Sequence, residues 1–250
     1  MNSPENPTQI ESREKEPTPF ATVFIVRHGD TQYKEEFSDP NVEEDLTDKG
    51  KGQIQALAER INDEVNLDEK VYVMMSPRIR AKNSTEILED SLIQKGHKVV
   101  KLGGGRPSLS NIKILDKAGA DVYKKHEDKE QYLADMAEVL ERLKQEGDYY
   151  LKSRAGTLEN PITENIGEYR NKVKTFSRRI IEIARQRAGD NEKLVLVTHG
   201  EWLDTILELY LGHKIKKVEH SADRGEAIKV EILADKLKFN FRGQIIEVEA

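Results

Sequence analysis

Short apolar runs alternate with amphipathic segments along this chain, which predicts strands that alternate with helices. Two apolar and β-branched runs, 22–26 and 194–197, end abruptly in polar triplets. Unbroken runs of this kind are typical of strands buried on both faces of a parallel sheet. A third run, 71–75, stops at the breaker Ser76-Pro77. We therefore predict three central strands, with 97–102 as a candidate fourth.

Apolar positions spaced three and four residues apart predict the helices between these strands. The predicted helices cover about 54–61, 80–94, 173–183 and 202–210. The last 30 residues instead alternate between apolar and polar positions around two turns, which predicts C-terminal strands. Strands and helices in this order indicate an α/β protein, a three-layer α/β/α fold with a mostly parallel central sheet.

The sequence predicts a tail, one domain and an insertion within that domain. Residues 1–20 contain four of the eight prolines and no apolar signal-peptide core, so we expect a disordered N-terminal tail. Residues 21–250 are expected to form a single domain. The breaker cluster Gly103 to Pro107 introduces a stretch, about 105–165, that interrupts the alternating order. Its helical period over 133–143 favours a helical cap.

Composition and charge exclude several classes of function. The chain of 250 residues has no cysteine, which excludes disulfides, thiolate metal sites and a thiol nucleophile. A reducing, cytoplasmic location is the expectation that follows. The formal net charge of -6, from 40 basic and 46 acidic residues, argues against nucleic-acid and anionic-membrane partners. No apolar run approaches the ~20 residues of a membrane span.

The candidate chemistry lies where the predicted strands end. Arg27-His28-Gly29 follows one buried run and Thr198-His199-Gly200 follows another. Ligands of α/β sheets bind beyond the carboxyl ends of the strands, so His28 and His199 are expected to meet there. The guanidinium groups of Arg27 and Arg80 match phosphate oxygens, and we expect the Gly29 N–H to approach the same anion. This set predicts a pocket for a phosphoryl group, with side chains neutralising its charge.

Four motifs in sequence order resemble those of the histidine phosphatase superfamily, also called the phosphoglycerate mutase-like family. The motifs are Val26-Arg27-His28-Gly29-Asp30-Thr31, Leu46-Thr47-Asp48-Lys49-Gly50 with Gln53, Ser76-Pro77-Arg78-Ile79-Arg80-Ala81 with Thr85, and Val197-Thr198-His199-Gly200. The resemblance implies that His28 is a nucleophile that becomes phosphohistidine. It also implies that Arg27 and Arg80 bind the phosphate, that His199 completes the pocket, and that no metal or cofactor takes part.

Two departures from the family pattern concern proton transfer and substrate fit. The family usually carries a Leu-x-Glu triplet whose glutamate protonates the leaving oxygen. Here one alignment places Leu109-Ser110-Asn111 on that triplet, and another places Leu115-Asp116 there. The candidate acids are Asp116, Asp121, Glu127 and Asp128. Asp30 and Lys34 also stand where the family signature commonly has Glu or Gln and Asn.

The sequence favours a metal-independent phosphomonoesterase that acts on a phosphorylated small molecule or phosphoprotein. A phosphoglycerate mutase-type phosphotransferase is the alternative enzyme, although the longer Glu-Arg-His stretch of such mutases is missing. A non-catalytic phospholigand-binding or scaffold protein is favoured by the missing acid. The natural substrate and the oligomeric state stay open. The remaining histidines lack metal-ligand spacing and are expected at the surface or in turns: His97, His126, His213 and His220.

Overall fold

The structure is a computed structural model that describes part of the chain. The described residues are 18–31, 45–110, 165–186, 192–212 and 222–249, together with the helical positions 138 and 141. Nearly all of the predicted tail 1–20 and most of the predicted cap 105–165 lie outside them. The predictions of a disordered tail and of a helical cap therefore stay predictions.

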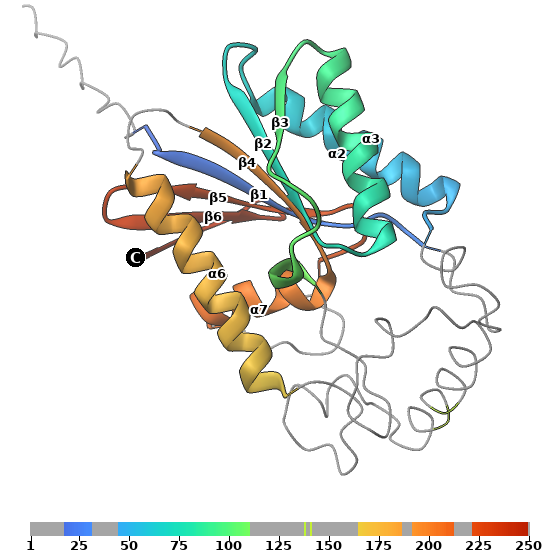
Figure 1. The fold of residues 1–250 in the computed structure, drawn as a ribbon. Coiled ribbons are helices and arrows are strands. Elements are labelled where there is room, and N and C mark those ends of the chain that lie inside the picture. The colour runs from blue at the N-terminus through green and yellow to red at the C-terminus, as the bar shows by residue number, and fades with distance from the viewer. Residues whose placement is uncertain are drawn as a thin grey trace, which may run out of the picture.

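In the part of the chain that the structure describes, seven strands form one mixed sheet in the order β3-β2-β4-β1-β5-β6-β7 (Figure 1). The strands are β1 (Ala21–Arg27), β2 (Lys70–Met75), β3 (Lys98–Lys101), β4 (Glu192–Thr198), β5 (Ala227–Ile232), β6 (Lys236–Phe241) and β7 (Gln244–Glu249). Strands β3, β2, β4 and β1 are mutually parallel, whereas β5, β6 and β7 extend the sheet in antiparallel pairs. The predicted parallel centre and the predicted C-terminal strands are both confirmed.

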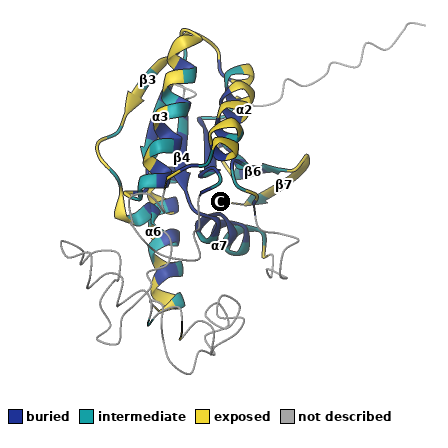
Figure 2. Cartoon of the chain, turned by 90° about the vertical axis from the view of Figure 1, so that its right-hand side faces the viewer, coloured by how far each residue is buried: buried dark blue, intermediate teal, exposed yellow. Residues whose placement is uncertain are grey.

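Helices cover both faces of the sheet and give three layers, as predicted (Figures 1 and 2). The helices among the described residues are α2 (Asp48–Glu64), α3 (Ile79–Gln94), α6 (Ile166–Gln186) and α7 (Gly200–Leu211), with a short 3-10 turn η1 (Pro107–Leu109). Helices α2 and α3 pack on one face and α6 and α7 on the other. The fold is therefore α/β with helices on both faces.

Strand β1 shows why its apolar run is unbroken. Its side chains alternate between two cores: Val23 and Ile25 pack with α6 and α7, while Phe24 and Val26 pack with α2 and α3. Each of these four side chains is at most 4% exposed. A strand buried on both faces needs an apolar residue at every position, because no position faces water.

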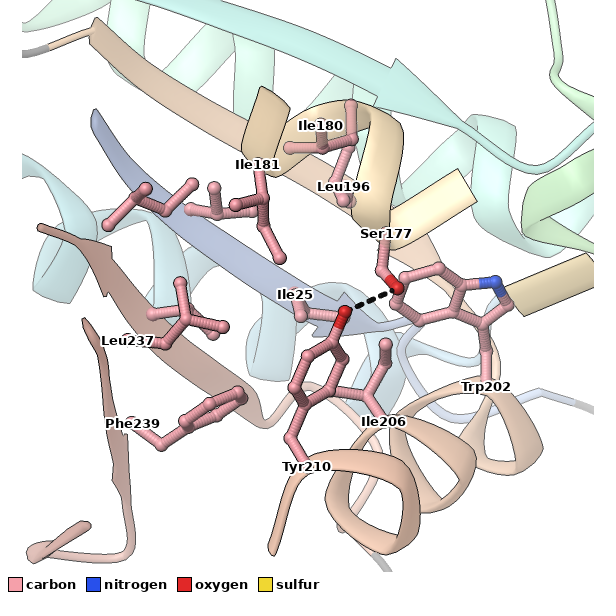
Figure 3. Close-up of a pocket in the computed structure, with 13 residues that line it drawn as sticks. Ile25, Ser177, Ile180, Ile181, Leu196, Trp202, Ile206, Tyr210, Leu237 and Phe239 are labelled. Carbon is pink, nitrogen blue, oxygen red and sulfur yellow. Dashed lines mark hydrogen bonds between the residues drawn. The ribbon is translucent and has the colours of Figure 1, made fainter. Parts of the chain in front are cut away.

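Trp202 is fully buried in the core between α6, α7 and the sheet (Figure 3). A cavity of about 30 Å³ lies beside it, and the side chains around it are almost all apolar. The hydroxyl groups of Ser177 and Tyr210 at this cavity bond each other over 3.0 Å. A void of one water's size without free polar partners is a packing defect and not a ligand site.

The end of α3 corrects one prediction. Gly96 follows the helix with φ +96°, and the N–H groups of Gly96 and His97 donate to the carbonyls of Ile93 and Leu92. This Schellman turn folds the chain back onto the helix. His97 is consequently 5% exposed, with Nε2 2.8 Å from Oδ1 of Asn62. Of the expectation that His97 lies at the surface or in a turn, the turn is confirmed, because His97 belongs to the turn at Gly96, but its side chain is buried. The other three histidines outside the motifs lie outside the described residues.

No helix in the described part of the chain is both long enough and apolar enough to cross a membrane.

Candidate active site

Three adjacent strands end side by side at one edge of the sheet. Strand β1 ends before His28, β4 before His199 and β2 before Ser76, and β4 lies between the other two. Two backbone hydrogen bonds hold these ends in register, from His28 N–H to the Thr198 carbonyl (3.0 Å) and from Ser76 N–H to the Val197 carbonyl (2.9 Å). The structure therefore brings together the two histidines that the sequence placed at strand ends.

The rings of His28 and His199 meet edge to face, with centroids 5.1 Å apart and planes at 65°. Both side chains are almost fully buried, with exposures of 3% and 1%. Two buried imidazoles at van der Waals distance are well placed to touch the same small ligand. A charge on either ring would be costly in this environment.

Two hydrogen bonds fix the tautomer of His28. Nδ1 lies 2.7 Å from the Gly29 carbonyl, and because a carbonyl only accepts, Nδ1 carries the proton. Nε2 accepts a hydrogen bond of 3.1 Å from Nε of Arg80. The lone pair of Nε2 therefore faces a guanidinium. This nitrogen is the nucleophilic atom of the neutral ring.

Arg80, which the sequence analysis expected to bind phosphate, is the arginine that contacts His28. It occupies the first turn of α3 and is 6% exposed, whereas Arg78 caps that helix in a half-buried position. Its charge stands at the amino end of α3, which also favours an anion. Because the Arg80 side chain is buried and its Nε donates to His28, its guanidinium is held in place without a ligand.

Arg27, the last residue of β1, directly precedes His28 in the chain. Its Nη1 donates to the Ala222 carbonyl over 2.6 Å, while its buried Nε has no hydrogen-bond partner among the described residues. The guanidinium lies against Gly200, where an added Cβ would stand 3.0 Å from Cζ of Arg27. The glycine of the second histidine motif thus makes room for the arginine of the first.

The structure corrects the expected role of Gly29. Its N–H donates to Oγ of Ser84 over 3.1 Å, so it is already bonded within the protein. A Cβ at Gly29 would overlap the carbonyl of Gly50 at the start of α2, and a Cβ at Gly50 would overlap the backbone of Asp30. Both glycines are needed for close backbone packing and not for anion binding.

The second motif, Leu46 to Gly50 with Gln53, has a structural role. Oγ1 of Thr47 caps α2 by accepting from the Gly50 N–H over 3.0 Å. Oε1 of Gln53 accepts from the Asp30 N–H over 2.9 Å. This motif therefore binds helix α2 to the segment that follows His28, and it sends no side chain of its own to the histidines.

Ser76 is a site residue that the sequence reasoning missed. Its Oγ lies 2.8 Å from Nε2 of His199, while Nδ1 of that ring is buried and has no hydrogen-bond partner in the part of the chain the structure describes. A buried ring nitrogen without a partner is costly unless a ligand meets it. The same strand-end argument that identified the two histidines would have identified Ser76, which ends a third buried run.

Electrostatics keep both rings neutral. Burial, and after it the charge of Arg80, lower the pKa of His28 well below its usual value. Burial lowers the pKa of His199 in the same way, again with Arg80 as the next contribution. Both imidazoles are therefore uncharged at neutral pH, and the positive charge of the site resides on its arginines.

Asp30 forms an ion pair with Arg224, a residue that no motif pointed to. Burial acts to raise the pKa of Asp30, but the hydrogen bond and charge of Arg224 outweigh it and lower that pKa. A carboxylate held ionised does not suit the role of proton donor. The four candidate acids of the sequence analysis, Asp116, Asp121, Glu127 and Asp128, lie outside the described residues.

Among the described residues, no group of three or more His, Asp or Glu side chains is arranged to hold a metal ion. The site that the structure does show has paired neutral imidazoles and arginines, a donor set that matches phosphate oxygens.

A sequence comparison finds a family model that matches the segment carrying the first three motifs. Residues 23–100 match the family model described as histidine phosphatase superfamily (branch 1). This range includes β1, α2, β2, α3 and β3, and with them three of the four predicted site residues: Arg27, His28 and Arg80. No curated protein matches the chain.

Solved structures share the fold over most of the chain. YhfR from Bacillus stearothermophilus superposes with a TM-score of 0.59 at 16% identity, covering 90% of this chain and 98% of that one. A phosphoglycerate mutase from Bacillus anthracis gives 0.52 at 16%, with 92% of each chain covered. The mycobacterial glucosyl-3-phosphoglycerate phosphatase gives 0.53 at 14%, covering 84% of this chain and 89% of its own. At these identities the likeness concerns the fold.

Proposed function

We propose that the chain is a metal-independent phosphomonoesterase that works through phosphohistidine at His28, a proposal that the match of residues 23–100 to the histidine phosphatase superfamily model supports. The observation that carries the proposal is the hydrogen-bonding of that ring. Nδ1 donates to the Gly29 carbonyl, which leaves the Nε2 lone pair toward Arg80. An imidazole held neutral, with its nucleophilic nitrogen beside a cation, is prepared for a phosphoryl group.

In the first step the phosphomonoester binds between the arginines. Its oxygens draw the guanidinium of Arg80 away from Nε2, and the Nε group of Arg27 provides a second donor. The lone pair of His28 Nε2 is then free to attack phosphorus. A nitrogen–phosphorus bond forms and the bond from phosphorus to the leaving oxygen breaks.

His199 serves the transition state in this proposal. Ser76 orients its ring through Nε2, so Nδ1 is the atom that donates a hydrogen bond to a phosphoryl oxygen. Its donor is already in place when charge develops on the oxygens, which is the condition for electrostatic stabilisation. The leaving oxygen takes its proton from one of the acids in the predicted cap, of which Asp116 is our first choice.

In the second step water attacks the phosphorus of phosphohistidine. The nitrogen–phosphorus bond breaks, inorganic phosphate leaves, and His28 returns to its neutral form. The acid that protonated the leaving group takes a proton from the water in this step. The cycle consumes water and needs no metal, because the arginines neutralise the charge of the phosphoryl group.

The test measures hydrolysis of p-nitrophenyl phosphate in the presence of EDTA, with a phosphate-labelled substrate to trap the intermediate. We expect turnover by the native chain, acid-labile label on His28, and loss of both in His28→Ala. His97→Ala is the matched control, because His97 is also buried but bonds to Asn62. Full activity of His28→Ala would overturn the proposal.

Two further outcomes would point to the alternative functions. Transfer of phosphate between the positions of a phosphoglycerate, in place of release, would indicate the mutase-type phosphotransferase. Phosphate binding without turnover of any phosphomonoester would indicate a phospholigand-binding scaffold.

A further inference from the structure

Residues 222–226, here called the 222–226 loop, lie against the segment that carries Arg27 and His28. The N–H of Gly225 is 3.2 Å from the carbonyl oxygens of both Arg27 and His28. The Arg27 N–H donates to the Glu226 carbonyl over 2.9 Å, and the Arg27 guanidinium donates to the Ala222 carbonyl over 2.6 Å. Both the backbone and the side chain of Arg27 therefore depend on where this loop lies.

One ion pair joins the loop to the segment that follows His28. Nη1 of Arg224 donates to Oδ1 of Asp30, two residues after His28. Asp30 is itself fixed, because Oδ2 accepts from Oγ1 of Thr47 over 3.2 Å and its N–H donates to Gln53. Arg224 therefore pairs with a carboxylate, that of Asp30, whose position is fixed by residues of helix α2 and its cap.

A second set of contacts joins the same loop to the turn between β6 and β7. Arg242, in the turn between β6 and β7, donates to Glu226 over 2.7 Å and to Asp223 over 3.1 Å. Arg242 is more exposed than Arg224, and its partner Asp223 is more exposed than Asp30. Arg242 is therefore the control, because its surface contacts are expected to contribute little to the position of the loop and go to Asp223 and Glu226 instead of Asp30.

The loop also has little freedom at its centre. Gly225 adopts φ +74°, and a Cβ there would stand 2.6 Å from Cβ of Gln53. Helix α2 thus packs directly on the loop backbone. In such tight packing, a small movement of Arg224 would also move Gly225 and Ala222. Gly225 bonds the carbonyls of Arg27 and His28, and Ala222 bonds the guanidinium of Arg27.

We propose that Arg224 is a positioning residue: its ion pair with Asp30 holds the 222–226 loop in place, and the loop in turn orients Arg27 beside His28. The part of this inference that concerns catalysis rests on the proposed function. The part that concerns anion binding does not, because Arg27 would hold a phosphate whether or not it is transferred. The Asp30 of this chain, which departs from the family signature, gains a structural role.

A different role for Arg224 predicts a different result. If Arg224 only added positive charge, Asp30→Asn would free that charge and strengthen phosphate binding, while Arg224→Gln would weaken it. If the pair positions Arg27, both substitutions break the same contact and both weaken binding. The two ideas therefore differ in the sign of the Asp30→Asn effect.

The experiment measures the Kd of inorganic phosphate by calorimetry for the full chain and for Asp30→Asn, Arg224→Gln, the double variant and Arg242→Gln. We expect each single variant at the Asp30–Arg224 pair to weaken binding roughly tenfold, on the scale of one charge-assisted hydrogen bond. The double variant should lose no more than either single one, because one contact is removed only once. Arg242→Gln should change the Kd less than about twofold.

Arg224→Lys is the conservative variant, and it should recover most of the binding because a lysine can still pair with Asp30. Thermal unfolding of every variant separates loss of the pair from loss of the fold. Tighter binding in Asp30→Asn, additive losses in the double variant, or an equal loss in Arg242→Gln would each overturn the proposal. Since phosphate binding is measured without turnover, a chain that proves inactive still tests this inference.

Discussion

Oγ of Ser76 lies 2.8 Å from Nε2 of His199, and this hydrogen bond joins the ends of two adjacent strands. Strand β2 thereby orients a ring that β4 carries. The ring nitrogen left over, Nδ1, is buried without a partner among the described residues. The serine that follows one strand therefore leaves Nδ1 as the ring nitrogen of the neighbouring histidine that has no partner among the described residues.

Ser76→Ala should lower kcat for p-nitrophenyl phosphate about tenfold with a smaller change in KM, because the ring of His199 loses its orientation. Steady-state kinetics checks this. Ser177→Ala is the control, since Ser177 is also buried but bonds to Tyr210 in the opposite core. Equal kcat values for the two variants would remove Ser76 from the site.

Arg80→Ala should lower kcat/KM about a hundredfold or more, as removal of a preorganised donor to the reacting group commonly does. Arg78→Ala should change it only a few-fold, because Arg78 is half-buried and Arg80 is the one bonded to His28. Competition by inorganic phosphate measures the same difference without turnover. Equal effects of the two substitutions would contradict this assignment.

Gly200→Ala should weaken phosphate binding about tenfold, because the added Cβ presses on the guanidinium of Arg27. Gly52→Ala is the matched control in another helix, since nothing lies within 4 Å of its Cβ position. That variant should keep its phosphate affinity and gain up to about 1 kcal/mol in free energy of unfolding. Calorimetry measures the phosphate affinity of both variants, and thermal unfolding measures their stability. Unchanged affinity in Gly200→Ala would refute the steric argument.

The free energy of unfolding should fall as the pH drops from about 6.5 toward 5. Burial lowers the pKa of His28 and of His199 in the folded protein, so in this range the unfolded chain binds more protons than the folded one. Protonation then favours unfolding, by at most about 1.4 kcal/mol per pH unit for each ring.

Urea unfolding at several pH values measures that slope. The slope should be shallower in His28→Gln and in His199→Gln, whatever the absolute stability of these variants. A slope in this range that neither substitution changes would mean that the two rings do not carry it.

Asp116→Asn should lower turnover of alkyl phosphates more than of aryl phosphates, because an alkoxide needs a proton far more than a phenolate does. Parallel measurements on p-nitrophenyl phosphate and on a glycerol phosphate check this. Asp121→Asn, the neighbouring candidate in the predicted cap, is the comparison. Equal losses on both substrates would exclude Asp116 as the acid.

Local patterns determined much of the fold. The unbroken runs at 22–26, 71–75 and 194–197 specified β1, β2 and β4, because a strand covered on both faces needs apolar residues throughout. The same runs placed His28 and His199 at the strand ends. The apolar period at 54–61 predicted α2, although the helix begins earlier, at Asp48, where Thr47 caps it.

Tertiary contacts decided what the local patterns could not. Gly29 resembled an anion-binding glycine, yet its N–H is bonded to Ser84 and its missing side chain admits Gly50. His97 resembled a turn residue, yet the turn at Gly96 folds it into the protein. In both cases a helix that is distant in the sequence supplies the partner: α3 carries Ser84, which bonds Gly29, and α2 carries Asn62, which bonds His97.

The sequence by itself determined the order of the strands and helices and the residue types at the strand ends, because hydrophobic period and strand termination are local properties. Only the tertiary structure decided that Ser76 orients His199 and that Arg224 meets Asp30. Hydrogen bonds and ion pairs between segments this far apart depend on atomic positions that the packed sheet and helices set. No spacing within the chain encodes them.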